Sequence, residues 1–171
     1  MKSYVYHSAT ATAHALIEHL IAMMEREPEK TFCFAFRGNR PEMEAKHYST
    51  RVCRTVPLGG CFPAFDVVLL GAGDDGHTSS IFPGQEYLLS SFHPYEVSVN
   101  PYNGQKRIAM TGCLLFAAKN LIFFVTGKNK ADVVRDILDS GDTGPAAYVA
   151  HHAERVELFL DAQANGGKMS T

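Results

Sequence analysis

The feature that most constrains the fold is an apolar run that leads directly into a glycine-rich turn. Residues 65–84 read FDVVLLGAGDDGHTSSIFPG. The segment Val67 to Leu70 is too short for a helix and rich in β-branched and aliphatic residues, so it predicts a central strand of a covered sheet. Gly71, Gly73 and Gly76 then allow the backbone to turn tightly or to approach a ligand closely. This arrangement is typical of the way α/β enzymes present reactive side chains.

The turn carries two aspartates and a histidine, Asp74, Asp75 and His77. The hydroxyl residues at 78–80 follow as the first turn of a short predicted helix, which the Pro-Gly pair at 83–84 would end. We therefore expect His77 at the carboxyl end of a strand, beside a helix amino terminus.

The same glycines match a dinucleotide-binding fingerprint, with Glu96 about twenty residues further on as the ribose ligand. Asp74 and Asp75 argue against it, because they place two carboxylates where a pyrophosphate would lie. Pro83 would also end the following helix too early for a crossover to a parallel strand. The alternative without a ligand is a plain glycine turn with a solvated aspartate pair.

Three segments together resemble the 6-phosphogluconolactonase family. They read G-x-DGHTSS-x-FPG over 73–84, KRI-x-x-T over 106–111 and LIFFVTG-x-x-KA over 121–131. That family hydrolyses 6-phosphoglucono-δ-lactone in the pentose phosphate pathway, and it shares one superfamily and the Gly-Asp-Gly-His core with glucosamine-6-phosphate deaminases. Deaminases resemble one another in an Asn-Glu-Pro run shortly after the histidine, where this chain has Ile81, Phe82 and Pro83. The resemblance therefore favours the lactonase branch, a carboxylic ester hydrolase, over deaminase or isomerase chemistry.

The resemblance implies an α/β fold with a mostly parallel sheet flanked by helices, Rossmann-like and of the sugar-phosphate isomerase and lactonase type. It runs from Arg37 to Leu160. In the family, the strand that matches Phe32 to Phe36 leads into a Ser-Gly-Gly-Ser-Thr-Pro loop that cradles the sugar phosphate, and a later strand carries an Asp-Glu-Arg motif. Neither motif is present in this sequence. We therefore expect a sheet that is incomplete at one side.

Lactone hydrolysis requires a nucleophilic water, a base to take its proton, and support for the oxyanion that develops. His77 is the candidate base. A helix amino terminus would disfavour the imidazolium form, whereas Asp75 would orient the ring and stabilise that form once it appears. Without the resemblance, His77 would be interpreted as a surface histidine in a glycine turn.

A phosphosugar needs basic side chains as well as backbone donors. The resemblance implies that Arg107 and Lys130 lie near the substrate phosphate, and that Gly73 and Gly76 contribute to substrate binding. Their ordinary alternatives are an arginine that covers a sheet edge and a solvated lysine. An inactive family member that at most binds a phosphosugar is the second hypothesis for the whole chain.

Hydrophobic patterning predicts alternating strands and helices in the remainder of the chain. Strands are expected at Ser3 to His7, Thr31 to Phe36, Tyr95 to Val99, Arg107 to Thr111, Leu121 to Thr126 and Val156 to Leu160. Helices are expected from Ser8 to Arg26, Pro41 to Val56, Asn129 to Leu138 and Ala146 to His151, with a loop at 57–60. The first helix carries an apolar stripe formed by Ala13, Leu16, Ile17, Leu20, Ile21 and Met24.

Composition excludes several classes of protein. A chain of 171 residues with 46% hydrophobic content predicts one domain with one core, spanning 1–171 with a flexible tail at 162–171. A net charge of −2 without a Lys/Arg run argues against nucleic acid as a partner, and the apolar stretches are too short for a membrane span. Without a C-x-x-C pair or a signal-peptide start, we expect a cytoplasmic protein with reduced thiols. The scattered histidines predict no metal, and the expected reaction needs no cofactor.

Overall fold

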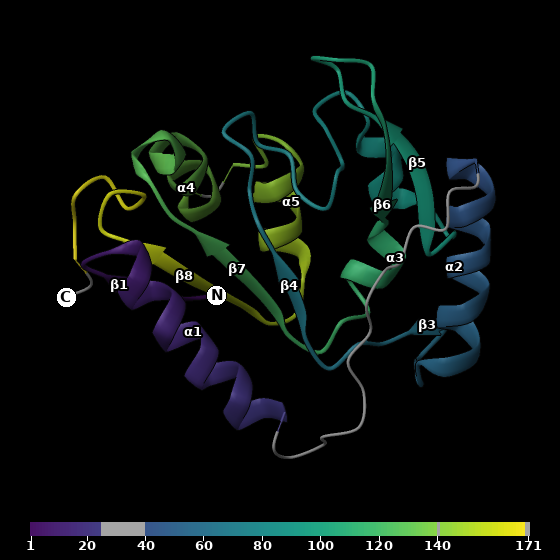
Figure 1. Ribbon diagram of the computed structural model, residues 1–171, viewed down its shortest axis with the longest axis horizontal. Helices are drawn as coiled ribbons and strands as arrows, with labels where there is room; N and C mark the ends of the chain where they lie inside the picture. Colours follow the sequence, from purple (N-terminus) through teal and green to yellow (C-terminus); the bar gives the residue numbers. More distant parts are fainter. Residues whose placement is uncertain (25–39, 140, 170–171) are drawn as a thin grey trace.

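The centre of the protein is a four-stranded parallel sheet in the order β1-β8-β7-β4 (Figure 1). The computed structural model describes residues 1–24, 40–139 and 141–169. The strands are β1 (Lys2–Tyr6), β8 (Val156–Asp161), β7 (Leu121–Val125) and β4 (Val68–Leu70). Because neighbouring strands pair in parallel, their carboxyl ends meet at one edge of the sheet.

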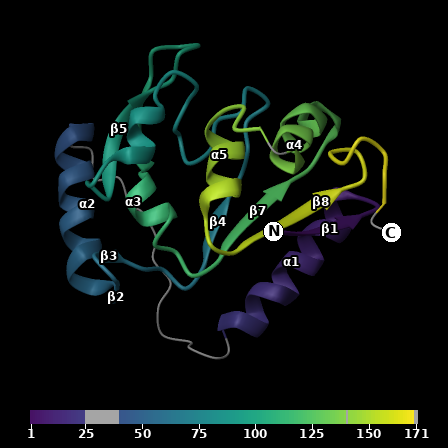
Figure 2. The ribbon, with the colours of Figure 1, turned by 180° about the vertical axis from the view of Figure 1, so that it is seen from behind.

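Helices cover both faces of this sheet. They are α1 (Ala9–Met24), α4 (Ala131–Leu138) and α5 (Pro145–His152). Side chains alternate between the two faces of a strand. Ile122 and Phe159 pack with Leu16 of α1 on one face, whereas Phe123 and Leu158 join the main core with α4 and α5 on the other. Figures 1 and 2 show α1 on the opposite side of the sheet from α4 and α5.

A second layer lies beside β4. It contains α2 (Pro41–Thr55), α3 (Gly112–Leu115), the antiparallel pair β5 (Tyr95–Val99) and β6 (Lys106–Met110), the short pair β2 (Leu58–Gly59) and β3 (Phe62–Pro63), and the 3-10 helix η1 (Glu86–Ser90). A further 3-10 helix, η2 (Lys128–Lys130), leads into α4. Tyr48 of α2 meets Tyr95 of β5 edge to face, with ring centroids 4.6 Å apart, and this contact anchors a small second core.

Most of the predicted elements are confirmed within one or two residues. Ser8 caps α1 as expected, because its Oγ accepts a hydrogen bond from the Ala11 backbone N–H at 3.2 Å. The segment predicted as a strand at Thr31 to Phe36 lies outside the described residues. None of the helices in the described ranges is long and apolar enough to cross a membrane.

The predicted apolar stripe of α1 is only partly correct. Thr12 and Leu16 are buried, whereas Ile17, Ile21 and Met24 are each about half exposed. The buried positions of α1, Thr12 and Leu16, lie one turn apart along the helix. The apolar residues beside this line are therefore partly exposed to solvent. Leu138, at the end of α4, is likewise 42% exposed.

The strand after Phe65 was expected in the centre of the sheet. Among the described strands β4 pairs with β7, and Leu69 is 51% exposed. Because the strand expected at Thr31 to Phe36 lies outside the described residues, the central position of β4 stays a prediction. The loop expected at 57–60 instead contains β2, which pairs with β3.

The segment after β8 was expected to be a flexible tail. Residues 162–167 form consecutive turns, in which the Gly167 N–H donates to the Ala162 carbonyl at 2.7 Å, and Ala164 is fully buried. This packing favours an ordered start to the tail. Its flexibility, and the single-domain organisation, stay predictions.

Candidate active site

The segment after β4 is a turn closed by its own backbone. The Gly73 N–H donates to the His77 carbonyl at 2.8 Å, and the Gly76 N–H donates to the Gly73 carbonyl at 3.1 Å. Gly76 adopts a φ of +84°, in the left-handed region that favours glycine. Thr78 Oγ1 donates to the Gly71 carbonyl at 2.7 Å, which ties the far side of the turn to the end of β4.

The short helix predicted at 78–80 is wrong. Ser79 and Ser80 have φ values of 53° and 63°, and Thr78 and Ile81 form a two-way backbone bridge across them. Hydroxyl side chains can bond to neighbouring backbone and so compete with helix formation. Here Ser79 Oγ both donates to the carbonyl and accepts from the N–H of Met110 in β6.

A different helix amino terminus lies beside the turn. The backbone N–H of Ala146, in the first turn of α5, donates to the Gly76 carbonyl at 2.9 Å. The helix end expected near His77 therefore comes from a segment about seventy residues further along the chain, which local sequence patterns do not reveal.

Asp75 and His77 form a tight side-chain pair at the top of this turn. His77 Nδ1 lies 2.5 Å from Asp75 Oδ1, which also accepts the His77 backbone N–H at 3.2 Å. Burial by itself would raise the pKa of Asp75, but the His77 hydrogen bonds and an interaction with the Tyr102 hydroxyl outweigh it, so the pKa is lowered. An ionised Asp75 accepts the Nδ1 proton of a neutral imidazole, which leaves Nε2 with the lone pair that a general base needs. The histidine side chain is 35% exposed, so solvent can reach the ring.

Gly73 and Phe82 shape the space around the pair. A Cβ added at Gly73 would lie 2.1 Å from His77 Nδ1 and 2.3 Å from Asp75 Oδ1, so only glycine fits there. The buried ring of Phe82 contacts the imidazole, with centroids 4.6 Å apart. Phe82 therefore supports one side of the imidazole ring.

Lys130 reaches the same turn from the end of β7. Its Nζ lies 4.0 Å from Asp74 Oδ1, and its side chain is 22% exposed. The loop that carries it is fixed by the buried Asp161 at the end of β8. Both carboxylate oxygens of Asp161 accept the Gly127 N–H, at 3.0 and 3.2 Å, and Oδ1 also accepts the Ala164 N–H at 2.8 Å.

Arg107 lies on β6 opposite Ser98 and is exposed. It shares a strand face with Ala109, which packs into the main core, whereas Ile108 on the other face packs into the smaller core. Within the described residues, Arg107 makes no ion pair.

The structure therefore brings together five of the six predicted site residues: Gly73, Asp75, Gly76, His77 and Lys130. Arg107 makes no ion pair or side-chain hydrogen bond with them among the described residues, and all six functional roles stay predictions. Sequence patterns missed Tyr102 and Asp161, which act across long stretches of chain. For Asp161, the available signal was an acidic residue directly after the apolar run Leu158 to Leu160.

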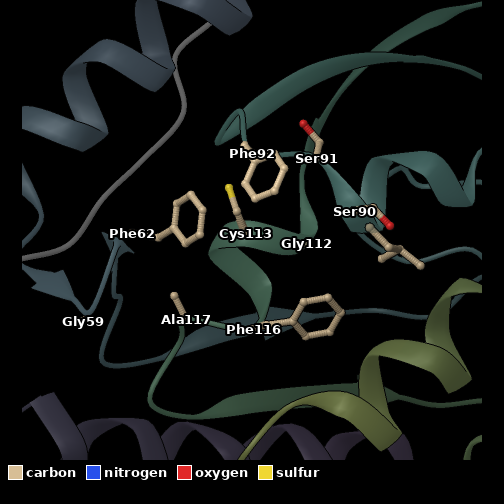
Figure 3. A pocket seen from close by; sticks show the side chains of 10 residues that line it. Gly59, Phe62, Ser90, Ser91, Phe92, Gly112, Cys113, Phe116 and Ala117 are labelled. Atoms are coloured by element: carbon tan, nitrogen blue, oxygen red, sulfur yellow. The ribbon is translucent and has the colours of Figure 1, made fainter.

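Two cavities lie away from this turn. One, of about 340 Å³, is lined by residues of β3, α3 and the segment after η1, and Figure 3 shows Phe62 and Phe92 on either side of Cys113. The other, of about 780 Å³, lies between α2 and β5 and is lined by Lys46, Arg54 and Glu96 among others. His77 lines neither cavity. Over the described ranges, no three His, Cys, Asp or Glu side chains cluster closely enough to hold a metal ion.

Comparisons with known proteins agree on one family. The sequence model for glucosamine-6-phosphate isomerases/6-phosphogluconolactonase matches residues 6–158. The 6-phosphogluconolactonase of Treponema pallidum is 36% identical over 135 residues, which cover 78% of this chain and 54% of the relative. The human 6-phosphogluconolactonase is 35% identical over 127 residues, which cover 72% of this chain and 49% of the relative. The chain thus spans about half the length of these curated relatives.

Solved structures give the same result. The devB protein superimposes with a TM-score of 0.70 at 34% identity, covering 75% of this chain and 55% of that one. The 6-phosphogluconolactonase of Trypanosoma brucei superimposes with a TM-score of 0.65 at 31% identity, covering 72% and 52% of the two chains. By its sequence and its fold, the chain belongs to the glucosamine-6-phosphate isomerase/6-phosphogluconolactonase family.

Proposed function

We propose that this chain hydrolyses 6-phosphoglucono-δ-lactone to 6-phosphogluconate, with His77 as the general base. The observation that carries the proposal is the 2.5 Å contact between His77 Nδ1 and Asp75 Oδ1 at the end of a parallel strand, with the imidazole still accessible to solvent. Relatives at 35% and 36% identity are named for this activity. In this proposal the protein is a cytoplasmic enzyme whose partner is a small phosphosugar.

The geometry is suited to acid–base chemistry on an ester. His77 Nε2 takes a proton from a water molecule as the water oxygen attacks the lactone carbonyl carbon. The bond between that carbon and the ring oxygen then breaks, and the imidazolium returns the proton to the departing oxygen. Asp75 stays ionised throughout and stabilises the imidazolium between the two steps.

Phe82 favours this reaction over the deaminase alternative. At the positions where deaminases carry their glutamate, this chain has the buried side chains of Ile81 and Phe82, and Phe82 packs against the catalytic imidazole. A carboxylate for sugar-ring opening is therefore absent at this point of the turn.

Lys130 is the proposed phosphate ligand. It lies beside Asp74, which is 69% exposed and can turn toward solvent when a phosphate competes for the ammonium group. An inactive member that only binds a phosphosugar is the second candidate, favoured by the absence of any described contact between Arg107 and the turn.

The test is a coupled assay with 6-phosphoglucono-δ-lactone and with unphosphorylated glucono-δ-lactone, each against a buffer blank for spontaneous hydrolysis. We expect the chain to accelerate hydrolysis of the phosphorylated lactone more strongly.

Lys130→Met should raise KM for that substrate about tenfold, because a charge-assisted contact is lost. The matched control is Lys128→Met, which removes an exposed lysine of the same 3-10 turn. A rate equal to the blank would reject the enzyme, and equal KM values for both lysine variants would reject Lys130 as the phosphate ligand.

A further inference from the structure

One oxygen of the Asp75 carboxylate has no partner. Oδ1 accepts both hydrogen bonds from His77, whereas Oδ2 is buried and accepts none from the described residues. A buried carboxylate oxygen without a donor is unfavourable, because it has lost its water without gaining a replacement. A donor close to Oδ2 would also fix the rotation of the carboxylate, and with it the direction in which Oδ1 faces the imidazole.

Tyr102 lies close enough to Asp75 for the two groups to affect each other's ionisation. The interaction with Asp75 is the main cause that raises the pKa of Tyr102, and the charge of Asp74 acts in the same direction. The same interaction contributes to the lowered pKa of Asp75, after burial and the His77 hydrogen bonds. Both effects have the sign expected when a phenol hydroxyl donates to a carboxylate.

The loop that carries Tyr102 is held in one conformation by its own hydrogen bonds. It connects β5 to β6, and Figures 1 and 2 show it at the same end of the molecule as the segment after β4. Asn100 closes the loop: its backbone N–H donates to the Gln105 carbonyl, its carbonyl accepts from Gly104, and its side chain accepts the Tyr102 N–H, all at 2.8–2.9 Å.

The hairpin formed by β5 and β6 also makes hydrogen bonds with the segment that follows His77, at two points. Ser79 exchanges hydrogen bonds with the backbone of Met110 in β6, at 3.0 and 3.1 Å. The Gln85 side-chain amide exchanges hydrogen bonds with both backbone groups of Val99 in β5. The two strands that present Tyr102 are therefore held in register with the turn that presents Asp75.

We propose that Tyr102 is a positioning residue for the Asp75 and His77 pair, and that its hydroxyl donates a hydrogen bond to Asp75 Oδ2. The proposal deepens the proposed lactonase function and rests on it for its catalytic consequence. With Oδ2 held by Tyr102, Oδ1 stays directed at His77 Nδ1, and Nε2 stays directed outward.

The other ionisable groups near the carboxylate do not fill this role. His77 already bonds to Oδ1, and a second carboxylate, that of Asp74, is an acceptor and not a donor. Lys130 lies against Asp74, at the 4.0 Å limit of an ion pair.

The test compares wild type with Tyr102→Phe, which keeps the ring and removes only the hydroxyl. The matched control is Tyr87→Phe, since Tyr87 is a similarly exposed tyrosine in η1, at 61% against 72%. Carbon-13 NMR of the Asp75 carboxyl, assigned with Asp75→Asn, gives the pKa of Asp75 in each protein without requiring activity. We expect the pKa of Asp75 to rise in Tyr102→Phe, because its charged form has lost a donor, and to stay unchanged in Tyr87→Phe.

In the lactone assay, kcat should fall about fivefold in Tyr102→Phe with KM unchanged, because the lost bond orients the base and does not touch substrate. An unchanged pKa of Asp75 in Tyr102→Phe would overturn the hydrogen bond, even if the wild-type chain proves inactive. A raised pKa with unchanged kcat in an active enzyme would overturn the positioning role. Inactivity of the wild type itself would instead count against the proposed function. The titration of the Asp75 carboxyl would still show whether the Tyr102 hydroxyl donates a hydrogen bond to it.

Discussion

At the scale of single residues, the candidate site depends on how closely the backbone at Gly73 approaches the side chains of Asp75 and His77. Gly73 has no side chain and donates its N–H to the His77 carbonyl, so the start and end of the turn meet at this residue. The space where its Cβ would lie is occupied by the Asp75 and His77 side chains. The absence of one methyl group therefore decides whether the pair can form.

Gly73→Ala should remove activity without unfolding the protein. The added methyl group would push His77 and Asp75 apart, and we expect kcat/KM to fall at least about 100-fold, with about 1–3 kcal/mol lost from the free energy of unfolding. Gly71→Ala is the matched control, because an added Cβ there meets nothing within 4 Å and the backbone needs no positive φ. Steady-state kinetics and urea unfolding of both variants check the prediction. Similar kinetics for the two alanine variants would contradict it.

At the scale of secondary-structure elements, the site is assembled from the ends of three strands and one hairpin. β4 leads into the turn that carries Asp75 and His77, and β7 leads into the loop that carries Lys130. β8 ends at Asp161, which accepts the Gly127 N–H. Asp161 thus couples two adjacent parallel strands at the edge of the sheet where the candidate site lies. The loop that carries Lys130 starts from this anchor.

Asp161→Ala should loosen the lysine loop. Removal of the carboxylate leaves the Gly127 and Ala164 N–H groups without their acceptor, and we expect a loss of about 2–3 kcal/mol in the free energy of unfolding. KM should rise more than kcat falls, because the loop presents the proposed phosphate ligand and does not carry the base. Glu154→Ala removes an exposed acid from the segment before β8 and serves as control in the same unfolding and kinetic measurements. A rise in KM of equal size in both variants would argue against the anchor.

The elements themselves were largely predictable, because their signals are local. The apolar run Leu121–Val125 and the segment Tyr95–Val99, in which polar residues alternate with apolar ones, were both predicted to be strands, and both predictions are confirmed. The conformation at 78–81 was not predictable, because the Ser79 hydroxyl is bound by Met110, 31 residues away. Tyr102 was missed for the same reason: its interaction with Asp75 joins the loop between β5 and β6 to the turn after β4, two segments that are separate in the sequence.

At the scale of the whole molecule, the described residues form one parallel sheet with a second layer beside β4. Among the described strands β4 pairs with β7 alone, and the expectation of a sheet that is incomplete at one side stays a prediction, because Thr31 to Phe36 lie outside the described residues. The contact between Asp75 and His77 is nonetheless present, because both side chains come from the turn itself, and the first turn of α5 bonds to the Gly76 carbonyl of the same turn. In the proposed function, substrate binding would depend on more distant parts, since Lys130 and Arg107 come from different elements. We therefore expect phosphate affinity to be the weaker property of this chain.

The central claim is that His77 removes a proton from water during lactone hydrolysis. The most direct measurement is the enzymatic rate of His77→Ala on saturating 6-phosphoglucono-δ-lactone, after subtraction of the blank, beside His14→Ala as an exposed histidine on α1. We expect a fall of about 100-fold or more for His77→Ala and no change for His14→Ala. Equal rates for the wild type and both variants, all above the blank, would contradict it.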